Sequence, residues 1–435
     1  MKILLVRPSY YLPNGSIHKL HRPYLISGTL PYLAALTPPD IEIELLEENV
    51  QDINFDGDYD LVGITAMINT VPRAYDIADE FRRRGKTVVM GGVHVSSVPD
   101  EALQHADAVV IGEAEDVWPQ LIRDFQKGEL KRIYRREGWA DLSDLPTPRY
   151  DLLPFKGFPL TFYPVQTTRG CPHNCEFCAV TKFYGHCYRF RPIEQVIRDV
   201  EATQSKYIFF VDDNFAVNRK RTIELCQALK PLGITWVTQA EIRIGEDPEL
   251  CQIMAESGCK VVVVGIETVN PNGLASLGKK HNLPLVHKYA QLIRTIQESG
   301  IAVVASMIFG IDGDTSQSLR ETVEFLIQTR VAGAMFYTLL PYPGTPLAQR
   351  LEAEGRILTK DWKLYDAMHA VIKPSNMEPE ELEEVLEWAY QRFYSLPSII
   401  KRLFFPPKAY IHPIILYNLE YRWAAKRGLI GLLTQ

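Results

Sequence analysis

The sequence lacks the long apolar runs that membrane-spanning segments need. None of its 435 residues belongs to a run of roughly 18 consecutive apolar residues. The apolar stretch at residues 3–6 is too short for a secretory signal, and we interpret it as a buried strand. Internal repeats and low-complexity tracts are also missing, which excludes a repeat array. The net charge is −6, so we expect no nucleic-acid partner.

The sequence also lacks the even, spread-out set of cysteines that a disulfide framework needs. It has seven cysteines, and three of them are clustered within residues 171–178. An odd number with such a cluster favours a reducing compartment, so we expect a cytoplasmic protein. The length indicates two or three domains.

The clustered cysteines have a C-x3-C-x2-C spacing. Cys171, Cys175 and Cys178 offer three thiolates on one short loop, and such thiolates hold iron–sulfur clusters. A closed [4Fe-4S] cluster needs four cysteines, so one iron would stay open to a substrate, beside the aromatic Phe177. The alternatives are a zinc site with His173 as fourth ligand and a broken disulfide framework.

Short apolar runs alternate with helical patterns in the first 145 residues. This alternation predicts a doubly wound parallel sheet, whose ligands bind beyond the carboxyl ends of the strands. The predicted strands are residues 3–6, 41–46, 61–66, 87–90 and 108–111, and the clearest helix is 72–84. The pattern at Gly91-Gly92 is not G-x-G-x-x-G, so a dinucleotide site is disfavoured.

Six further strand-like runs predict an open (β/α)6 barrel between residues 161 and 355. The strands are 163–168, 207–212, 235–240, 260–266, 302–309 and 333–339, and the helices include 193–203, 219–229, 284–299 and 315–329. Active sites in such barrels lie at the carboxyl ends of the strands. The cysteine loop and most of the distinctive polar residues fall at those ends.

The cysteine motif, placed after a strand that ends in Arg169-Gly170, resembles the signature of radical S-adenosylmethionine (SAM) enzymes. The resemblance implies a partial barrel, a [4Fe-4S] cluster that binds SAM through its open iron, and cleavage of SAM to methionine and a 5′-deoxyadenosyl radical. It also implies an electron donor such as flavodoxin or ferredoxin. The three motif cysteines are then the cluster ligands.

The resemblance assigns the polar residues at the barrel's strand ends to SAM. An arginine suits a carboxylate, so Arg243 is the candidate there. The remaining SAM candidates are Glu241 and Glu267 for the ribose, Asp212 and Asp213 for the amine, and Phe177 and Gly310 beside the adenine. The family usually has Gly-Gly-Glu where Asp212-Asp213 stands, and the alternative for each acid is a solvated carboxylate or a helix cap. Tyr184 and Cys187, just after the cluster loop, are candidate hydrogen-atom or proton donors or residues that pack over the loop.

Gly-Gly-x-His-x-Ser followed by Gly-Glu-x-Glu, ahead of such a barrel, resembles the Rossmann-like cobalamin-binding domain of one radical SAM branch. The implied cobalamin contacts are Thr65, Ala66, Met67, Asn69, Gly91, Gly92, His94, Ser96, Gly112 and Glu113. The sequence lacks the D-x-H-x-x-G motif that supplies a histidine to cobalt, so Met67, Ile68 and Asn69 are the candidates for the lower face. His94 could instead ligate cobalt, form a local hydrogen bond or contact the nucleotide tail of cobalamin. For the whole domain, the alternative is a degenerate Rossmann unit that binds nothing.

A proline-rich linker and a basic tail complete the chain. We predict domains at residues 1–145 and 161–355, a linker at 146–160 and a mostly helical extension at 356–435, with a helix at 379–394. Residues 401–435 carry six basic side chains and one acidic one, mixed with aromatics. This composition suits a peripheral membrane contact or a lipid-like substrate, and a docking helix on the barrel is the alternative.

The predicted fold class is therefore α/β, with a Rossmann-like domain, a partial (β/α)6 barrel and a helical extension. The resemblance implies a cobalamin-dependent C-methyltransferase acting on an unactivated carbon of a hydrophobic small molecule, such as a lipid-like compound or a tetrapyrrole. The alternatives are an oxidative cyclase or rearrangement enzyme, a radical SAM enzyme with a vestigial cobalamin domain, and a cobalamin carrier or sensor. The sequence does not determine the oligomeric state.

Overall fold

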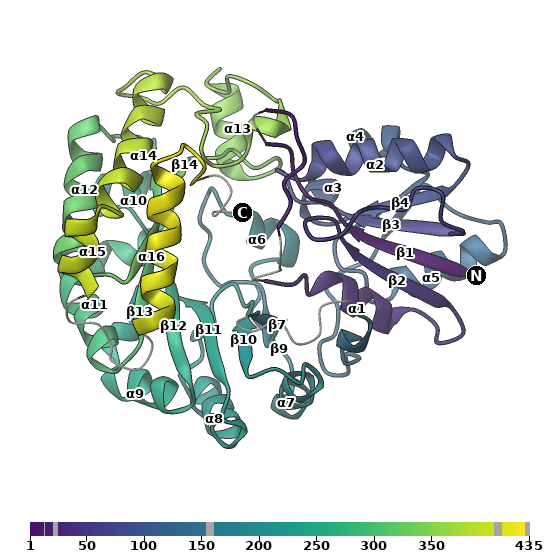
Figure 1. The fold of residues 1–435 in the computed structure, drawn as a ribbon, viewed down its shortest axis with the longest axis horizontal. Coiled ribbons are helices and arrows are strands. Elements are labelled where there is room, and N and C mark those ends of the chain that lie inside the picture. The colour runs from purple at the N-terminus through teal and green to yellow at the C-terminus, as the bar shows by residue number, and fades with distance from the viewer. Residues whose placement is uncertain (13, 21–24, 154–160, 404–410, 431–435) are drawn as a thin grey trace. The chain divides into compact units, whose positions relative to one another are not determined.

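The structure is a computed structural model of the whole chain, and it describes every residue except 13, 21–24, 154–160, 404–410 and 431–435. Most of the predicted linker's second half and part of the basic tail therefore lie outside the described residues. The chain divides into two compact units, which Figure 1 shows as ribbons. The first unit is Met1–Gly170 with Ala179–Ile208, and the second is Cys171–Cys178 with Phe209–Gln435.

The first unit is built on a six-stranded sheet in the order β2-β1-β3-β4-β5-β6, with every neighbouring pair parallel. The strands are β1 (Lys2–Arg7), β2 (Glu42–Glu47), β3 (Leu61–Thr65), β4 (Thr87–Gly91), β5 (Ala108–Ile111) and β6 (Ile133–Arg135). This order changes direction between β1 and β3, as in doubly wound folds that bind a ligand at that point. The predicted sheet is confirmed; only β6 was missed, because its single buried residue gives almost no apolar signal.

Helices connect these strands and follow them in the first unit. They are α1 (Thr29–Leu36), α2 (Val71–Arg83), α3 (Val93–Ser97), α4 (Pro99–His105), α5 (Val117–Gln126), α6 (Ala179–Tyr184) and α7 (Ile193–Ala202), with a 3-10 turn η1 (Tyr150–Leu152). The apolar stripe of α2 is buried, and its exposed positions are charged, so it covers the sheet as its periodicity predicts.

The second sheet has the order β14-β13-β12-β11-β10-β7. Its strands are β7 (Tyr163–Val165), β10 (Tyr207–Phe210), β11 (Thr235–Ala240), β12 (Cys259–Glu267), β13 (Ala302–Phe309) and β14 (Gly333–Thr338). The pairs from β11 to β14 are parallel. The six predicted strands are all present, but the run at 163–168 is divided. Thr168–Arg169 forms a separate strand, β8, which pairs antiparallel with β9 (Arg189–Phe190).

Helices of the second unit lie between its strands and beyond them. They are α8 (Arg219–Leu229), α9 (Pro248–Glu256), α10 (Pro271–Ser276), α11 (Tyr289–Glu298), α12 (Ser316–Gln328), α13 (Pro346–Ala353), α14 (Pro379–Phe393), α15 (Leu396–Leu403) and α16 (Ile411–Ala425). Short 3-10 turns are η2 (Lys230–Leu232), η3 (Ile242–Glu246), η4 (Lys280–Lys288) and η5 (Trp362–Leu364). Helices α12, α14 and α16 lie side by side in Figure 1, and they are in contact in that order.

The helix predicted at residues 284–299 begins later than its periodicity suggested. Residues up to Lys288 form the 3-10 turn η4, and the α-helix starts at Tyr289. Pro284 explains the difference, because a proline inside an α-helix removes a backbone donor and clashes with the preceding turn.

Candidate functional site

The three motif cysteines lie on one loop of the second unit, and all three are free thiols. Cys175 is buried and the other two are half-buried. Burial raises the pKa of Cys171 to about 11 and that of Cys175 to about 12. Three soft donors on one loop of eight residues fit a [4Fe-4S] cluster held by three thiolates, since a bound metal replaces the protons of such thiols.

The backbone of the cysteine loop is clamped on both sides by other parts of the second unit. The amide of Glu176 donates to the Leu277 carbonyl at 2.9 Å, and the Glu176 carbonyl accepts from the amide of Leu347 at 3.0 Å. A Cβ on Gly278 would lie 3.2 Å from the Asn174 carbonyl oxygen, so the backbone at Gly278 packs closely against the cysteine loop. The cysteines are therefore held in place by main-chain contacts on both sides of the loop.

A buried ion pair lies beside this clamp. Lys279 Nζ is 2.7 Å from Glu267 Oε1, and both side chains are about nine-tenths buried. Glu267 has a left-handed backbone, φ +62°, at an irregularity in the pairing of β12 with β13, and such bulges redirect a side chain. The Lys279 charge favours the thiolate of Cys175, while burial raises the pKa of that thiol more strongly. Lys279 is not among the residues predicted from the sequence, where its only signal is the Lys-Lys-His run directly after Gly278.

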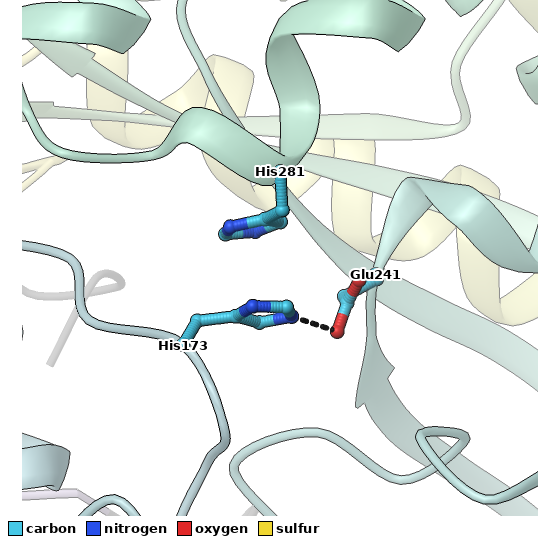
Figure 2. Close-up of side chains that lie close together, drawn as sticks. All are labelled: His173, Glu241 and His281. Carbon is cyan, nitrogen blue, oxygen red and sulfur yellow. Dashed lines mark hydrogen bonds and ion pairs between the residues drawn. The ribbon is translucent and has the colours of Figure 1, made fainter.

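A stacked pair of imidazoles faces Glu241 at the end of β11. The rings of His173 and His281 are 3.5 Å apart at their centroids and 10° from parallel. Figure 2 shows His173 Nε2 hydrogen-bonded to Glu241 Oε1, at 2.5 Å, and the same oxygen accepts a hydrogen bond from Asn214. The histidine in the cysteine loop and the predicted ribose residue Glu241 are thus in direct contact.

The electrostatics of this group favour a neutral His281 and an ionised Glu241. Burial lowers the pKa of His281 to about 4, and the neighbouring His173 adds to the effect. Burial is the largest single influence on Glu241 and opposes its ionisation. The hydrogen bonds from His173 and Asn214, together with the charges of the two histidines, hold its pKa below the usual value.

The three side chains His173, Glu241 and His281 come close enough to suggest a metal site, because their ligand atoms lie within 4.8 Å of one another. The parallel rings argue against it. The lone pair of an imidazole nitrogen lies in the ring plane, so two rings stacked 3.5 Å apart hold their lone pairs in two nearly parallel planes, which do not meet at one ion. The group instead presents a flat aromatic face and a carboxylate next to the cysteine loop.

The other predicted SAM residues lie at the strand ends with partners of their own. Arg243 donates to the His281 carbonyl at 3.2 Å and pairs with Glu246 at 3.1 Å, and about half of its side chain is exposed. Phe177 and Asp213 are half-buried, and Asp212 is fully buried. Gly310 has φ +88°, and a Cβ there would lie 2.7 Å from Leu382.

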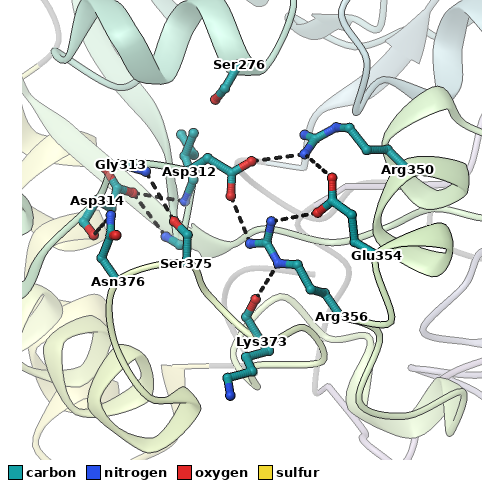
Figure 3. A network of polar contacts seen from close by, with 12 residues as sticks. Ser276, Asp312, Gly313, Asp314, Arg350, Glu354, Arg356, Lys373, Ser375 and Asn376 are labelled. Carbon is teal, nitrogen blue, oxygen red and sulfur yellow. Dashed lines mark hydrogen bonds and ion pairs between the residues drawn. The ribbon is translucent and has the colours of Figure 1, made fainter.

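The turn that follows β13 is fixed by a polar network. Figure 3 shows Asp312 between two arginines, at 2.9 Å from Arg350 and 2.8 Å from Arg356. Arg350 also lies 3.4 Å from Glu176 of the cysteine loop. The Gly310 turn and the cysteine loop are therefore connected through one guanidinium.

In the first unit, the predicted cobalamin residues gather at the carboxyl ends of β3, β4 and β5. Thr65 is the last residue of β3. The amide of the next residue, Ala66, donates to the Gly91 carbonyl at 3.0 Å. Met67 is 58% exposed although it is a large apolar residue. Gly92 has φ +104°, and a Cβ there would lie 2.7 Å from the Ala66 carbonyl. An exposed apolar side chain next to closely packed glycine backbone, at the carboxyl ends of β3 and β4 in a parallel sheet, fits a large planar group such as a corrin.

The remaining candidates of the first unit differ in exposure. Ser96 Oγ accepts from the amide of Gly112 at 2.9 Å, and Asn69 is half-buried. The His94 side chain is fully buried, with Nε2 3.5 Å from Glu101. His94 is thus enclosed within the unit, whereas Met67 is exposed.

Glu113 is enclosed by two arginines that flank the cysteine motif in sequence. Its carboxylate lies 2.6 Å from Arg169 and 3.0 Å from Arg189, which are cross-strand partners in β8 and β9, and it accepts from the amide of Ala140 at 2.8 Å. Glu115 adds a second carboxylate, 2.6 Å from Arg169. Burial opposes ionisation of Glu113, but the arginines and the amide hold its pKa below the usual value.

Tyr184 and Cys187 lie in the same neighbourhood. The Tyr184 ring is 5.7 Å from the Arg169 guanidinium, and its carbonyl accepts a weak hydrogen bond from Cys187 at 3.6 Å. A Cβ on Gly170, where φ is +85°, would lie 2.1 Å from the Cys187 carbonyl oxygen. Both residues thus pack around the strand that leads into the cysteine loop.

Comparison with known proteins agrees with this geometry. Residues 165–326 match the Radical SAM superfamily, and residues 34–122 match the B12 binding domain. The chain is 33% identical to bacteriochlorophyllide d C-8(2)-methyltransferase of Chlorobaculum tepidum, over 92% of this chain and 93% of that protein. It is 30% identical to hopanoid C-2 methylase of Rhodopseudomonas palustris, over 83% of this chain and 72% of that protein.

Two further proteins extend the comparison. The anaerobic magnesium-protoporphyrin IX monomethyl ester cyclase of Rubrivivax gelatinosus is 24% identical, over 91% of this chain and 77% of that protein. The solved structure of TsrM, a radical SAM methyltransferase from Kitasatospora setae, has the same fold, with a TM-score of 0.64 at 18% identity, and the match covers 81% of this chain and 75% of that one.

The cofactors of this chain are therefore a [4Fe-4S] cluster, SAM and cobalamin. The chain belongs to the radical SAM superfamily, in the branch that carries a B12-binding domain ahead of the radical SAM domain.

Proposed function

We propose that this enzyme is a C-methyltransferase that acts on an unactivated carbon of a hydrophobic small molecule. The observation that carries the proposal is the 33% identity to a methyltransferase of bacteriochlorophyllide d, over nearly the whole of both chains. The hopanoid C-2 methylase extends the likeness to a methylase with another kind of substrate. A lipid-like compound or a tetrapyrrole is therefore the proposed substrate class.

The second unit is the proposed site of radical generation. Cys171, Cys175 and Cys178 hold the cluster, and when bound the cluster and SAM supply one-electron cleavage of SAM while cobalamin supplies a transferable methyl group. Glu241 is oriented by His173 and Asn214, so its free oxygen is available to a ribose hydroxyl. The Lys279 charge lies close enough to Cys175 to stabilise its thiolate. The other proposed SAM contacts are Phe177, Asp212, Asp213, Arg243, Glu267 and Gly310.

The first unit is the proposed cobalamin site. Met67, which is exposed, would contact the corrin, and the backbone of Gly91 and Gly92, which carries no Cβ, would line the same site. We propose that the buried His94 packs inside the unit. Glu113 is proposed to pair with Arg169 of β8 and Arg189 of β9. Thr65, Ala66, Asn69, Ser96 and Gly112 complete the proposed contacts.

Tyr184 and Cys187 remain candidate hydrogen donors, and the external electron donor is proposed to be flavodoxin or ferredoxin. The domain boundaries at residues 145, 160 and 355 also stay predictions. Among the described residues, no helix combines the length and the apolarity needed to cross a bilayer.

The test is methyl transfer by the anaerobically purified, cobalamin-loaded enzyme. The enzyme is incubated with a low-potential reductant, SAM labelled in its methyl group, and a panel containing bacteriochlorophyllide d and a hopanoid hydrocarbon. The expected result is one labelled methyl group in one of these compounds, together with deoxyadenosine, and neither product with Cys175→Ala. Deoxyadenosine without label in any product would contradict methyl transfer.

Oxidative cyclisation is the second candidate, because a magnesium-protoporphyrin cyclase matches 91% of this chain. The same assay separates the two when a magnesium-protoporphyrin monomethyl ester is added to the panel. A product that has lost hydrogen atoms and carries no label would favour the cyclase.

A further inference from the structure

Helix α16 is apolar on two faces, which is unusual for a helix with one side exposed. Its inner face is packed: Ile414, Tyr421 and Ala424 are at most 5% exposed, and the Tyr421 ring stacks on Tyr394 at 4.9 Å. Asn418 anchors this face, because its Nδ2 donates to the Ala332 carbonyl at 2.8 Å. The inner face therefore packs against the second unit, as expected for a docking helix, which is one of the alternatives that the sequence predicts for the basic tail.

The outer face of α16 is apolar as well. Leu416, Leu419 and Trp423 are 55%, 42% and 50% exposed. Their spacing of three and four residues places them on one stripe along the helix. Packing against the second unit does not explain this stripe, because the inner face already supplies that packing.

The neighbouring helix α15 adds to the exposed apolar surface. Leu396 and Ile400, four residues apart on α15, are 46% and 63% exposed. Helices α15 and α16 contact each other, so the two stripes belong to one region of the second unit. We call these five residues, Leu396, Ile400, Leu416, Leu419 and Trp423, the tail surface. Isolated exposed apolar residues need no explanation, but a group of five on two adjacent helices does.

The charges carried by α15, α16 and the two residues after α16 are mostly positive. Lys401, Lys426 and Arg427 are exposed and Arg422 is half-buried, whereas Glu420 is the only acidic residue described in α15 and α16. The Arg427 guanidinium lies 4.4 Å from the centre of the Trp423 ring. Leucine and tryptophan with flanking lysine and arginine are the composition of helices that lie in the headgroup region of an anionic bilayer.

We infer that α15 and α16 dock this enzyme on the surface of an anionic membrane. Aliphatic side chains and Trp423 enter the interface, and the basic residues stay at the level of the lipid phosphates. A second copy of the chain is the less favoured occupant, because two such surfaces would bring their basic residues together. The inference rests on the proposed function in one respect only: a hydrophobic substrate would give the enzyme a reason to work at a membrane.

The test is co-sedimentation of the full, anaerobically purified enzyme with vesicles, without substrate. Vesicles of phosphatidylcholine are compared with vesicles that also contain phosphatidylglycerol, at low and high salt. We expect partitioning onto the anionic vesicles to be at least about tenfold stronger, because each basic residue near such a surface contributes several-fold. High salt should reduce the difference.

Variants identify the surface. Leu416→Glu with Leu419→Glu should lower partitioning about tenfold or more, and Lys426→Glu with Arg427→Glu should remove the preference for anionic lipid. Leu358→Glu is the matched control, because Leu358 is 50% exposed in the same unit but lies outside α15 and α16. Unchanged iron content and melting temperature show that each variant is folded.

Three outcomes would overturn the inference. The first is that the full enzyme does not bind anionic vesicles. The second is that Leu358→Glu weakens binding as much as Leu416→Glu with Leu419→Glu does. The third is a dimer in light scattering that the leucine variant dissociates without any vesicle binding, which would assign the surface to self-association. Because no methylated product is measured, failure here is distinguishable from failure of the proposed methyl transfer.

Discussion

At the scale of single residues, the charged side chains near the cysteine motif neutralise one another. Arg169 and Arg189 are direct cross-strand partners, and such like charges repel unless a carboxylate lies between them. Glu113 supplies that carboxylate from 56 residues earlier in the chain. Residues expected to contact cofactors thus also hold the framework around them.

We predict that Glu113→Ala destabilises the first unit strongly. The change leaves Arg169 with Glu115 but removes the carboxylate that Arg189 pairs with in a mostly buried setting, and such a loss typically costs about 3 to 5 kcal/mol. Thermal unfolding followed by circular dichroism should show a clearly lower transition. The exposed Glu129→Ala is the control and should leave it almost unchanged. Equal melting of both variants would mean that the ion pairs around Glu113 do not stabilise the fold.

Asp314 gives a prediction about pH. Its carboxylate accepts from the amides of Gly310 and Ile311 at 3.1 and 3.0 Å, yet burial raises its pKa to about 7. An unfolded aspartate has a pKa near 3.9. Between these two values the unfolded chain releases the proton and the folded chain keeps it, so this group's contribution to stability falls as pH rises from about 4 to 7.

Asp314→Asn should remove this dependence, because an asparagine stays neutral and can still accept from both amides. We expect the melting temperature of the variant, relative to the unmodified enzyme, to rise between pH 5 and pH 7 and to level off above. Melting curves of both proteins at pH 5, 6, 7 and 8 measure this difference in melting temperature. A difference that does not change with pH would show that Asp314 keeps an ordinary pKa.

At the scale of elements, the entry into the cysteine loop depends on one glycine. Strand β8 ends at Arg169, and Gly170 then turns with φ +85°, a conformation that side chains with a Cβ rarely adopt. A Cβ there would also lie 2.1 Å from the Cys187 carbonyl oxygen. The position therefore excludes alanine for both steric and conformational reasons.

We predict that Gly170→Ala lowers the iron content of the purified enzyme as well as its stability. The added methyl group would collide with the Cys187 carbonyl, so the backbone at position 170 has to shift. Position 170 directly precedes Cys171, and the shift therefore moves a cluster ligand. Gly128→Ala is the matched control, because Gly128 has φ +74° with nothing within 4 Å of the added carbon. It should cost only about 1 to 2 kcal/mol through its backbone conformation, without loss of iron. Full iron occupancy in Gly170→Ala would contradict the prediction.

At the scale of the whole molecule, the two cofactor sites belong to separately packed units. The cysteines of the motif all lie in the second unit, and the proposed cobalamin contacts all lie in the first. Loss of one cofactor should therefore leave the other site intact.

We predict that Cys175→Ala loses iron but keeps cobalamin. Metal analysis and the absorbance of bound cobalamin, after purification with hydroxocobalamin, measure both in one sample. Cys226→Ala is the control, because Cys226 is a buried cysteine of α8 outside the loop and its loss should leave both contents unchanged. Loss of cobalamin from Cys175→Ala would show that cobalamin binding depends on the cluster loop.

The sequence by itself determined the local features: the alternation of strands and helices in both sheets, and the cysteine motif with the cofactors it implies. These features depend on residues a few positions apart, so periodicity and spacing are enough to predict them. Only the tertiary structure decided which charges meet. Glu113 pairs with Arg189 across 76 positions and His173 bonds Glu241 across 68, and no spacing rule links residues so far apart. The exposed stripe of α16 was likewise undecided until packing fixed which face turned inward, because both faces are apolar.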